Sequence, residues 1–452
     1  MISRLSTILK LAFVLLTATV YQSCDSTLNI EKPKTYMKYI GADGDQTGVD
    51  MVTDDDGNIY ILGTSGVTPE VTQVYIVKTS SEGIVQWEQT YGNGGEDIPV
   101  DLEMLSTGSL VAAANKTDKS NGEKSIVVYA ISSTDGTMTA SRVIDTPGVA
   151  EFVNSITPTL AGGVPDGFVI AGYNDIGGVK HGLTLRVNAA LQDYAPEGSW
   201  TSNLDQLGNT PGDEGYDIVP VKIVQVSASL FYTFGYTNSI KDDDNIADYN
   251  FFINVTSGQN DLLNNTFFIR ATDATSDEKL SAVKQVPSTQ GGGFILTGYI
   301  STPGIDRQDL YMARVVQDLT TNGGAIASQP GSYLYHYPNL QPAKVTSGLS
   351  SVSSTAASVF PSEASGFLIL SVENSSGNNN IFLTKVKDTF ENAWSDPYTS
   401  HVFGGIGNDQ SGVVLEAGDG SILVCGSMTL GEVNGQSKIV LMRLNQEGMF
   451  GD

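Results

Sequence analysis

The segment Gly57–Gly63, GNIYILG, decides the fold, because its pattern returns six more times along the chain. In each copy a turn that ends in Gly or a small polar residue is followed by four or five apolar residues and then by a small residue. The other copies are Gly108–Ala114, Gly167–Gly172, Ser229–Gly235, Gly293–Gly298, Gly366–Ser371 and Gly420–Gly426. Successive copies lie roughly 50 to 75 residues apart, an interval typical of propeller blades rather than of solenoid repeats.

Each copy is followed, after a polar loop, by a second apolar segment that usually ends in a basic residue, as in Tyr75–Lys78 and Ile439–Arg443. The first repeat continues through a Gly turn into a further strand, Ile84–Tyr91. Short strands joined by Gly and Asx turns, four per repeat and without helical periodicity, indicate an all-β fold. The sequence therefore predicts a seven-bladed β-propeller.

The two ends of the repeat region predict how the ring closes. The last repeat stops at Asp452 without room for a fourth strand, whereas an unassigned strand, Thr35–Gly41, precedes the first repeat. We expect this N-terminal strand to complete the last blade, because pairing would remove the sheet edges that an open array exposes. The matching strings Asp45–Val49 (DQTGV) and Asp409–Val413 (DQSGV) also point to internal duplication.

The N-terminal segment 1–23 predicts export. Two basic residues precede an apolar run of about ten residues, Leu11–Val20, which is too short to span a membrane. Ser23 and Cys24 then resemble the lipobox of bacterial lipoproteins, in which the cysteine is lipidated after cleavage just before it. Tyr21 departs from the aliphatic residue expected there, which leaves ordinary secretory cleavage open. The predicted organisation is a signal peptide at 1–23, a tether at 24–34 that begins with acylated (palmitate-bearing) Cys24, and the propeller at 35–452.

The repeat pattern, a Gly-rich stretch with Asp, a Gly turn with an apolar strand, and then Lys or Arg, resembles repeats of secreted bacterial β-propeller lipoproteins. The resemblance covers Thr35 to Asp452. It implies the fold and a place in the bacterial cell envelope, as an outer-membrane lipoprotein that faces the periplasm or the surface. It implies no particular function, because propellers carry many unrelated ones.

The net negative charge of the chain limits the classes of partner that we expect it to bind. Of 452 residues, 50 are acidic and 24 basic, which gives a net charge of -26. Such a surface repels nucleic acids and anionic lipid headgroups, so we expect membrane contact through the lipid anchor only. We expect a monomer that binds a glycan or an envelope protein.

Acidic residues in the loops before the inner strands suggest one ligand site. Calcium takes six to eight oxygen ligands, which clustered carboxylates and carbonyls supply. The candidate ligands are Asp45, Asp97, Asp213 and Asp409. The alternative is that these residues cap backbone amides in tight loops and keep the surface soluble. No other cofactor is expected.

Three tyrosines occupy the same position in consecutive repeats, directly after the Gly that ends the strand: Tyr173, Tyr236 and Tyr299. We call them the tyrosine shelf. Exposed, they would suit sugar binding by stacking and hydrogen bonding. The alternative is that they fill the wedge between blades.

No sequence string forms a nucleophile elbow or a zinc-binding His pair, so no catalytic residue is assigned. The sequence favours a non-enzymatic, envelope-anchored binding or scaffold protein that uses the face carrying its d–a and b–c loops to bind a glycan, peptide or protein. The alternative is an envelope hydrolase or lyase acting on polysaccharide, with two carboxylates of this face as acid and base. A close carboxylate pair in the channel, with one raised pKa, would distinguish the two.

Overall fold

A computed structural model describes most of Thr35–Gly451, which is one compact unit. The described residues are 35–41, 44–68, 71–92, 95–194, 216–238, 248–257, 262–269, 276–286, 292–301, 308–315, 333–337, 354–356, 366–373, 378–387, 394, 400–405, 407–431 and 435–451. The predicted signal peptide, Cys24 and the tether lie outside them and stay predictions. Within the described ranges, no helix is long and apolar enough to cross a membrane.

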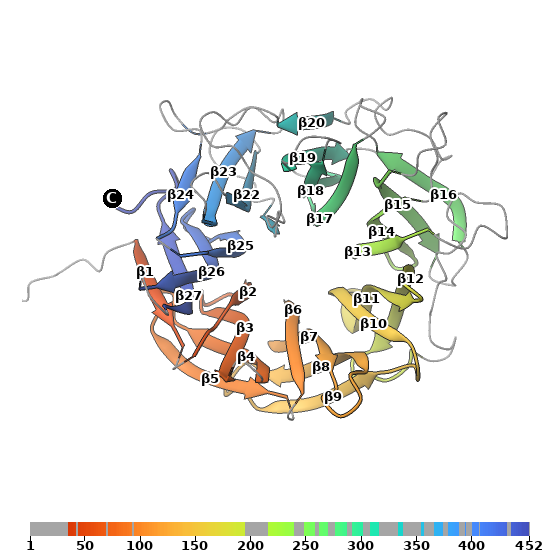
Figure 1. The fold of residues 1–452 in the computed structure, drawn as a ribbon, viewed down its shortest axis with the longest axis horizontal. Coiled ribbons are helices and arrows are strands. Elements are labelled where there is room, and N and C mark those ends of the chain that lie inside the picture. Colours follow the sequence, from red (N-terminus) through yellow and green to blue (C-terminus); the bar gives the residue numbers. More distant parts are fainter. Residues whose placement is uncertain are drawn as a thin grey trace, which may run out of the picture. The chain divides into compact units, whose positions relative to one another are not determined.

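The described chain forms seven antiparallel sheets around a common centre (Figure 1), which confirms the seven-bladed β-propeller. Blades 1 to 3, each read from the centre outward, are β2 (Gly48–Thr53), β3 (Ile59–Thr68), β4 (Val71–Thr79) and β5 (Val85–Tyr91); β6 (Glu96–Met104), β7 (Ser109–Thr117), β8 (Lys124–Ser132) and β9 (Met138–Ile144); and β10 (Ala150–Ala161), β11 (Val164–Ile176) and β12 (Val179–Asn188). Blades 4 to 6 are β13 (Ile218–Ser227), β14 (Leu230–Thr237), β15 (Asn250–Ser257) and β16 (Leu262–Ile269); β17 (Asp277–Gln285), β18 (Phe294–Ser301), β19 (Gln308–Val315) and β20 (Tyr333–Tyr337); and β21 (Ser354–Ala356), β22 (Gly366–Glu373), β23 (Asn380–Lys387) and β24 (His401–Phe403).

Blade 7 closes the ring in the predicted way. It consists of β25 (Gln410–Glu416), β26 (Ile422–Leu430), β27 (Gln436–Leu444) and, outermost, the N-terminal β1 (Tyr36–Ile40). β1 pairs antiparallel with β27 from Tyr36 opposite Arg443 to Ile40 opposite Ile439. The first strand of the propeller therefore covers the edge that β27 would otherwise expose.

The seven repeated apolar segments form the second strand of each blade, and they are apolar throughout because both of their faces are buried. In β3, Ile61 packs in a cluster with residues of blade 7, such as Leu441, whereas the next residue, Leu62, packs with Leu102 and other residues of blade 2. Similar clusters fill the other junctions between blades. A strand buried on both faces gives a continuous apolar run instead of an alternating one.

The small residue that ends the repeated segment is explained by a close backbone approach. A Cβ atom on Gly63 would lie 2.4 Å from the carbonyl oxygen of Thr47, and one on Gly298 would lie 2.0 Å from that of Lys279. Both oxygens belong to the inner side of the same blade, where the pairing with the inner strand is shifted by a β-bulge. Glycine leaves room for this bulge.

Candidate functional site

The inner strands surround a central cavity of about 260 Å³. β2, β6, β10 and β13 each carry a register shift at the same place, and the residues directly after the shift are Asp50, Asp101, Ser155 and Lys222. All four line the cavity, together with Glu103. The repeated bulge therefore places three charged side chains, those of Asp50, Asp101 and Lys222, at equivalent positions around the cavity.

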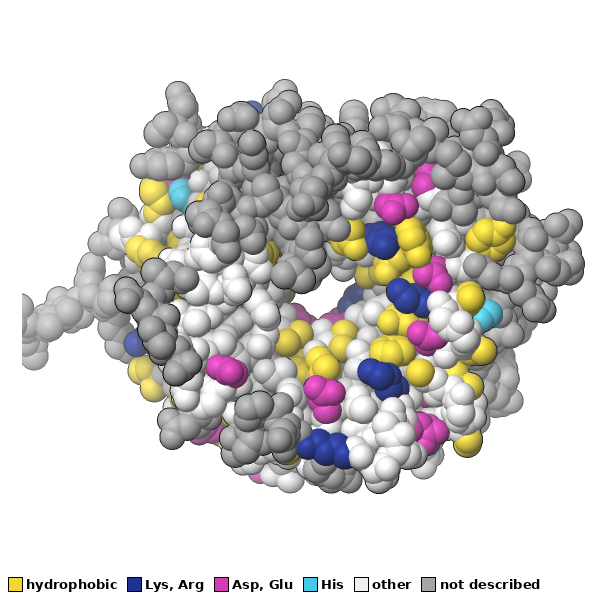
Figure 2. Space-filling view, viewed as in Figure 1, with side chains coloured by type: hydrophobic (Ala, Val, Ile, Leu, Met, Phe, Trp, Pro, Cys, Tyr) yellow, Lys and Arg dark blue, Asp and Glu magenta, His cyan; other side chains and the backbone are white. Residues whose placement is uncertain are grey.

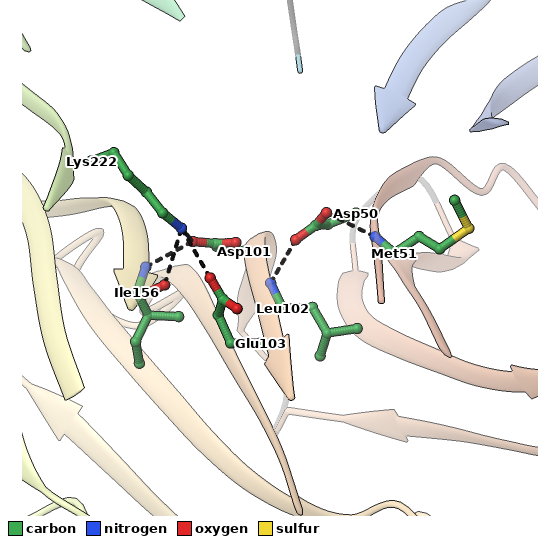
Figure 3. Close-up of polar contacts among 7 residues, drawn as sticks. All are labelled: Asp50, Met51, Asp101, Leu102, Glu103, Ile156 and Lys222. Atoms are coloured by element: carbon green, nitrogen blue, oxygen red, sulfur yellow. Dashed lines mark hydrogen bonds and ion pairs between the residues drawn. The ribbon is translucent and has the colours of Figure 1, made fainter. Parts of the chain in front are cut away.

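Lys222 holds three blades together at this cavity (Figure 3). Its Nζ lies 3.1 Å from Asp101 Oδ2 and 3.0 Å from Glu103 Oε1, and it donates a hydrogen bond of 3.3 Å to the Ile156 carbonyl oxygen. Asp101 Oδ2 also accepts a hydrogen bond of 2.8 Å from the Ile156 amide. The side chain of blade 4 thus binds groups of blades 2 and 3 at once.

Asp50 makes the corresponding connection between blades 1 and 2. Its Oδ2 accepts a 2.8 Å hydrogen bond from the Leu102 amide, and its Oδ1 accepts one of 2.8 Å from the Met51 amide. Figure 3 shows Asp50 and Asp101 on neighbouring inner strands. Their positions after equivalent bulges explain why each accepts an amide of the next blade.

Burial and the neighbouring charges change the pKa values of the groups in this cluster. Burial, and then the adjacent Asp101 carboxylate, raise the pKa of Asp50 well above its usual range. Burial also raises the pKa of Glu103, although the Lys222 ammonium opposes this. The pKa of Lys222 is raised, because Asp101 and Glu103 together outweigh the effect of burial. General acid catalysis uses a carboxyl group whose pKa is raised in this way.

The tyrosine shelf lies on the second strands of blades 3, 4 and 5, in β11, β14 and β18, and all three side chains are partly exposed. Burial, and then the phenols of Tyr299 and Tyr173, raise the pKa of Tyr236, so each of the two lies within electrostatic range of Tyr236. Tyr173 stacks on Phe152, with ring centroids 4.8 Å apart and an interplanar angle of 17°. The structure brings the predicted residues together.

Tyr236 also has a packing role. Its ring contacts Tyr249 edge-on, with centroids 5.7 Å apart, and it packs against the hydrophobic cluster between blades 4 and 5. The Tyr249 hydroxyl donates a 2.6 Å hydrogen bond to Asp217 Oδ2. These contacts between blades fix the orientation of the Tyr236 ring.

The predicted calcium ligands lie in separate places. Asp45 is exposed and its Oδ1 accepts a 2.9 Å hydrogen bond from the Ser437 amide. Asp97 is fully buried, and its pKa is raised by burial. Asp409 is also buried, and its carboxylate accepts hydrogen bonds from the amides of Gly405 (3.0 Å) and Thr429 (2.9 Å). Asp213 lies outside the described residues.

Across the described ranges, no group of three or more His, Cys, Asp or Glu side chains could hold a metal ion. Calcium binding stays a prediction.

Asp45 and Asp409 match in the two sequence strings, but they do not occupy equivalent positions in blades 1 and 7. Both inner strands carry one extra residue at the bulge, since Gly48 to Asp50 lies opposite Gly63 to Leu62, and Ser411 to Val414 lies opposite Gly426 to Val424. Ser411 pairs with Gly426 as Gly48 pairs with Gly63, so Asp409 occupies the position that Gln46 has in blade 1, one residue away from the match of the two sequence strings. Each of these buried side chains lies against the Gly that precedes it, Gly404 and Gly41 respectively. The position is therefore a repeated buried polar site at the blade junction.

Sequence reasoning missed the cluster of Asp50, Asp101, Glu103 and Lys222. One signal was present: Val49-Asp50-Met51 and Val100-Asp101-Leu102 follow the loops before the first two repeats. The same pattern recurs at Val221-Lys222-Ile223, but it does not show that Lys222 pairs with carboxylates of another blade.

Comparison with known proteins agrees with the fold. A family described as "Beta-propeller repeat" matches residues 35–69. This match supports a β-propeller repeat protein. None of the curated proteins compared with the chain matches it.

Several solved structures are similar at low identity. An α-L-arabinofuranosidase from Fusarium graminearum is 9% identical, with 91% of this chain and 98% of that chain covered and a TM-score of 0.41. Drosophila semaphorin 1b, extracellular domains 1–2, is 8% identical, with 92% and 88% covered and a TM-score of 0.46. The propeller domain of the trilobed protease from Pyrococcus furiosus is 7% identical, with 91% and 100% covered and a TM-score of 0.42. At such identities the likeness concerns the fold alone.

Proposed function

We propose that the chain is a non-enzymatic binding protein of the bacterial cell envelope, and that its tyrosine shelf binds a glycan. The partial exposure of all three neighbouring rings supports this proposal. Phenol rings offer flat apolar faces to sugar rings and a hydroxyl for hydrogen bonding. Residues fully buried between blades could do neither.

Substitution of the shelf tests this function. The purified full chain is screened on a glycan array, and the best ligand is then titrated against Tyr173→Ala, Tyr236→Ala and Tyr299→Ala. Each change should weaken binding by about 1 kcal/mol, the scale of one aromatic contact. Tyr39→Ala is the matched control, because Tyr39 is an exposed tyrosine of β1, in blade 7.

The alternative role of the rings predicts a different response. If they only fill the wedge, the same changes should lower the unfolding free energy by about 3 to 5 kcal/mol and leave ligand binding to the folded fraction unaltered. That pattern would contradict the proposal.

We also propose that a lipid on Cys24 anchors the protein in the outer membrane, on the motif at residues 21–24. Cys24→Ser should release the protein from the membrane fraction and abolish fatty-acid labelling. Unchanged labelling would exclude Cys24 as the anchor.

A second function, polysaccharide hydrolysis at the central cavity, is favoured by one observation: the pKa of Asp50 is raised beside a second carboxylate, Asp101. Against it, both carboxylates already accept backbone amides across blade junctions. Release of reducing ends from a polysaccharide by the full chain, lost in Asp50→Asn, would establish hydrolysis. Binding without such release supports the binding function.

A further inference from the structure

Three lysines lie over aromatic rings on and beside the tyrosine shelf. Lys124 Nζ lies 5.4 Å from the centroid of the Phe152 ring, the ring on which Tyr173 stacks. Lys180 Nζ lies 5.4 Å from the centroid of the Tyr173 ring. Lys279 Nζ lies 4.1 Å from the centroid of the Tyr249 ring, which contacts Tyr236. Ammonium groups therefore accompany the aromatic rings from the edge of blade 2 to blade 5.

Among the residues that the structure describes, these ammonium groups have no carboxylate partner. Within the described residues, the side chains of Lys124, Lys180 and Lys279 make no ion pair and no hydrogen bond beyond their ring contacts. Lys222, in contrast, binds two carboxylates in the central cavity. In a chain with 50 acidic residues and 24 basic ones, three accessible lysines without an acidic partner on one strip leave positive charge available for a ligand.

Two acidic residues beside the strip, Asp217 and Asp277, accept hydrogen bonds from other donors. Asp217 accepts hydrogen bonds from the Lys180 amide (3.0 Å) and from the Tyr249 hydroxyl (2.6 Å). Asp277 accepts one from the Tyr249 amide (3.0 Å). These carboxylates therefore fix the backbone and the ring of Tyr249, and the ammonium groups stay directed at aromatic faces.

Lys124 is exposed, and Lys180 and Lys279 are partly exposed. In Figure 2, dark blue Lys or Arg side chains lie among yellow hydrophobic and magenta acidic ones over the part of the ring that holds β10 to β18. Alternating aromatic rings and ammonium groups match a polymer whose rings have apolar faces and carry carboxylates.

We propose that the shelf, with Lys124, Lys180 and Lys279, binds an acidic polysaccharide whose sugar rings bear carboxylates. The inference rests on the proposed glycan-binding function and narrows its ligand class. The sugar faces stack on the phenol rings, while the carboxylates pair with the ammonium groups.

The test titrates the full chain with polygalacturonate, with neutral galactan and with poly-glutamate. We expect polygalacturonate to bind best and its affinity to fall as salt is raised. Each of Lys124→Gln, Lys180→Gln and Lys279→Gln should lower that affinity about two- to fivefold. Lys38→Gln is the matched control, because Lys38 lies over the Tyr36 ring at 5.8 Å, in blade 7. It should bind like the parent chain.

The outcomes separate the two proposals. If galactan binds as tightly as polygalacturonate, and only the tyrosine changes weaken binding, the acidic ligand is overturned. The proposed glycan-binding function is then retained. Tighter binding of poly-glutamate overturns the polysaccharide in favour of an acidic peptide. Binding of neither polysaccharide overturns the inference, and an empty glycan array contradicts the proposed function itself. The unfolding midpoint in urea is measured for each variant to separate lost binding from lost stability. Lys124→Glu reverses the charge at an exposed position and leaves packing intact.

Discussion

Replacement of Lys222 by Met tests whether the central cluster holds the blades together. Lys222 Nζ contacts Asp101, Glu103 and the Ile156 carbonyl within 3.3 Å, and 21% of its side chain is exposed. Met keeps most of the apolar stem but leaves two carboxylates without their cation. Removing one partner of a buried ionic group typically costs 3 to 5 kcal/mol, and partial exposure favours the lower end. We therefore expect a loss of about 3 kcal/mol in unfolding free energy at neutral pH.

The loss should depend on pH in a defined direction. The Lys222 ammonium lowers the pKa of Glu103 against the effect of burial, so its removal raises this pKa further. A carboxyl group with a raised pKa in the folded state binds its proton more tightly there than in the unfolded chain. Its contribution therefore becomes more favourable as the pH falls through the folded pKa. The deficit of Lys222→Met should shrink from about pH 8 to about pH 5.

Urea unfolding monitored by tryptophan fluorescence measures the effect at each pH. Lys38→Met is the control, because Lys38 contacts a tyrosine ring on the outer strand of blade 7 and its change should cost less than about 1 kcal/mol. A loss of unfolding free energy in Lys222→Met below about 1 kcal/mol, or a loss that is the same at both ends of the pH range, would refute the role of Lys222 in holding blades 2, 3 and 4 together.

Two further predictions concern the ring. Deletion of Thr35–Gly41 removes β1 and exposes the edge of β27, so a large fall in melting temperature or aggregation by light scattering is expected, whereas deletion of 26–34 should be nearly silent; equal melting temperatures would argue against closure. Gly298→Ala places a Cβ 2.0 Å from the Lys279 carbonyl and should cost about 2 kcal/mol in urea unfolding. Gly418→Ala, where no atom lies within 4 Å of the added Cβ, should change stability by less than about 0.5 kcal/mol, and equal effects of the two would contradict the close approach.

The sequence predicts the blades well because each second strand is buried on both faces. Residues such as Ile61 and Leu62 must both be apolar, since they contact opposite neighbours. Five of the seven segments end in a Gly that a local backbone approach requires, so this Gly marks the register without knowledge of the rest of the ring. For the same reason the sequence aligns Tyr173, Tyr236 and Tyr299, and the structure places them as neighbours.

The central cluster could not be predicted in the same way. Asp50, Asp101 and Lys222 occupy equivalent positions because each directly follows a β-bulge in its inner strand. Their interactions also cross blade boundaries, so Lys222 finds acidic partners more than a hundred residues earlier in the chain. Local pattern carries no information about such pairing. Asp409 and Gln46 occupy equivalent positions and are both buried, whereas Asp45, which matches Asp409 in the sequence strings, lies one residue earlier and is exposed.

The pairing of β1 with β27 brings the two ends of the propeller into contact, since the Gly451 amide donates a 2.9 Å hydrogen bond to Thr35 Oγ1. A covalent peptide connection at this point would need only a short linker. The chain could then be opened elsewhere, for example in the turn at Gly108 between β6 and β7, to give a circular permutant with the same seven sheets. In such a permutant an anchor would be fused at the new chain ends, at a different place on the ring. The choice of that place would orient the tyrosine shelf toward or away from the surface that holds the anchor, without any change to the shelf itself.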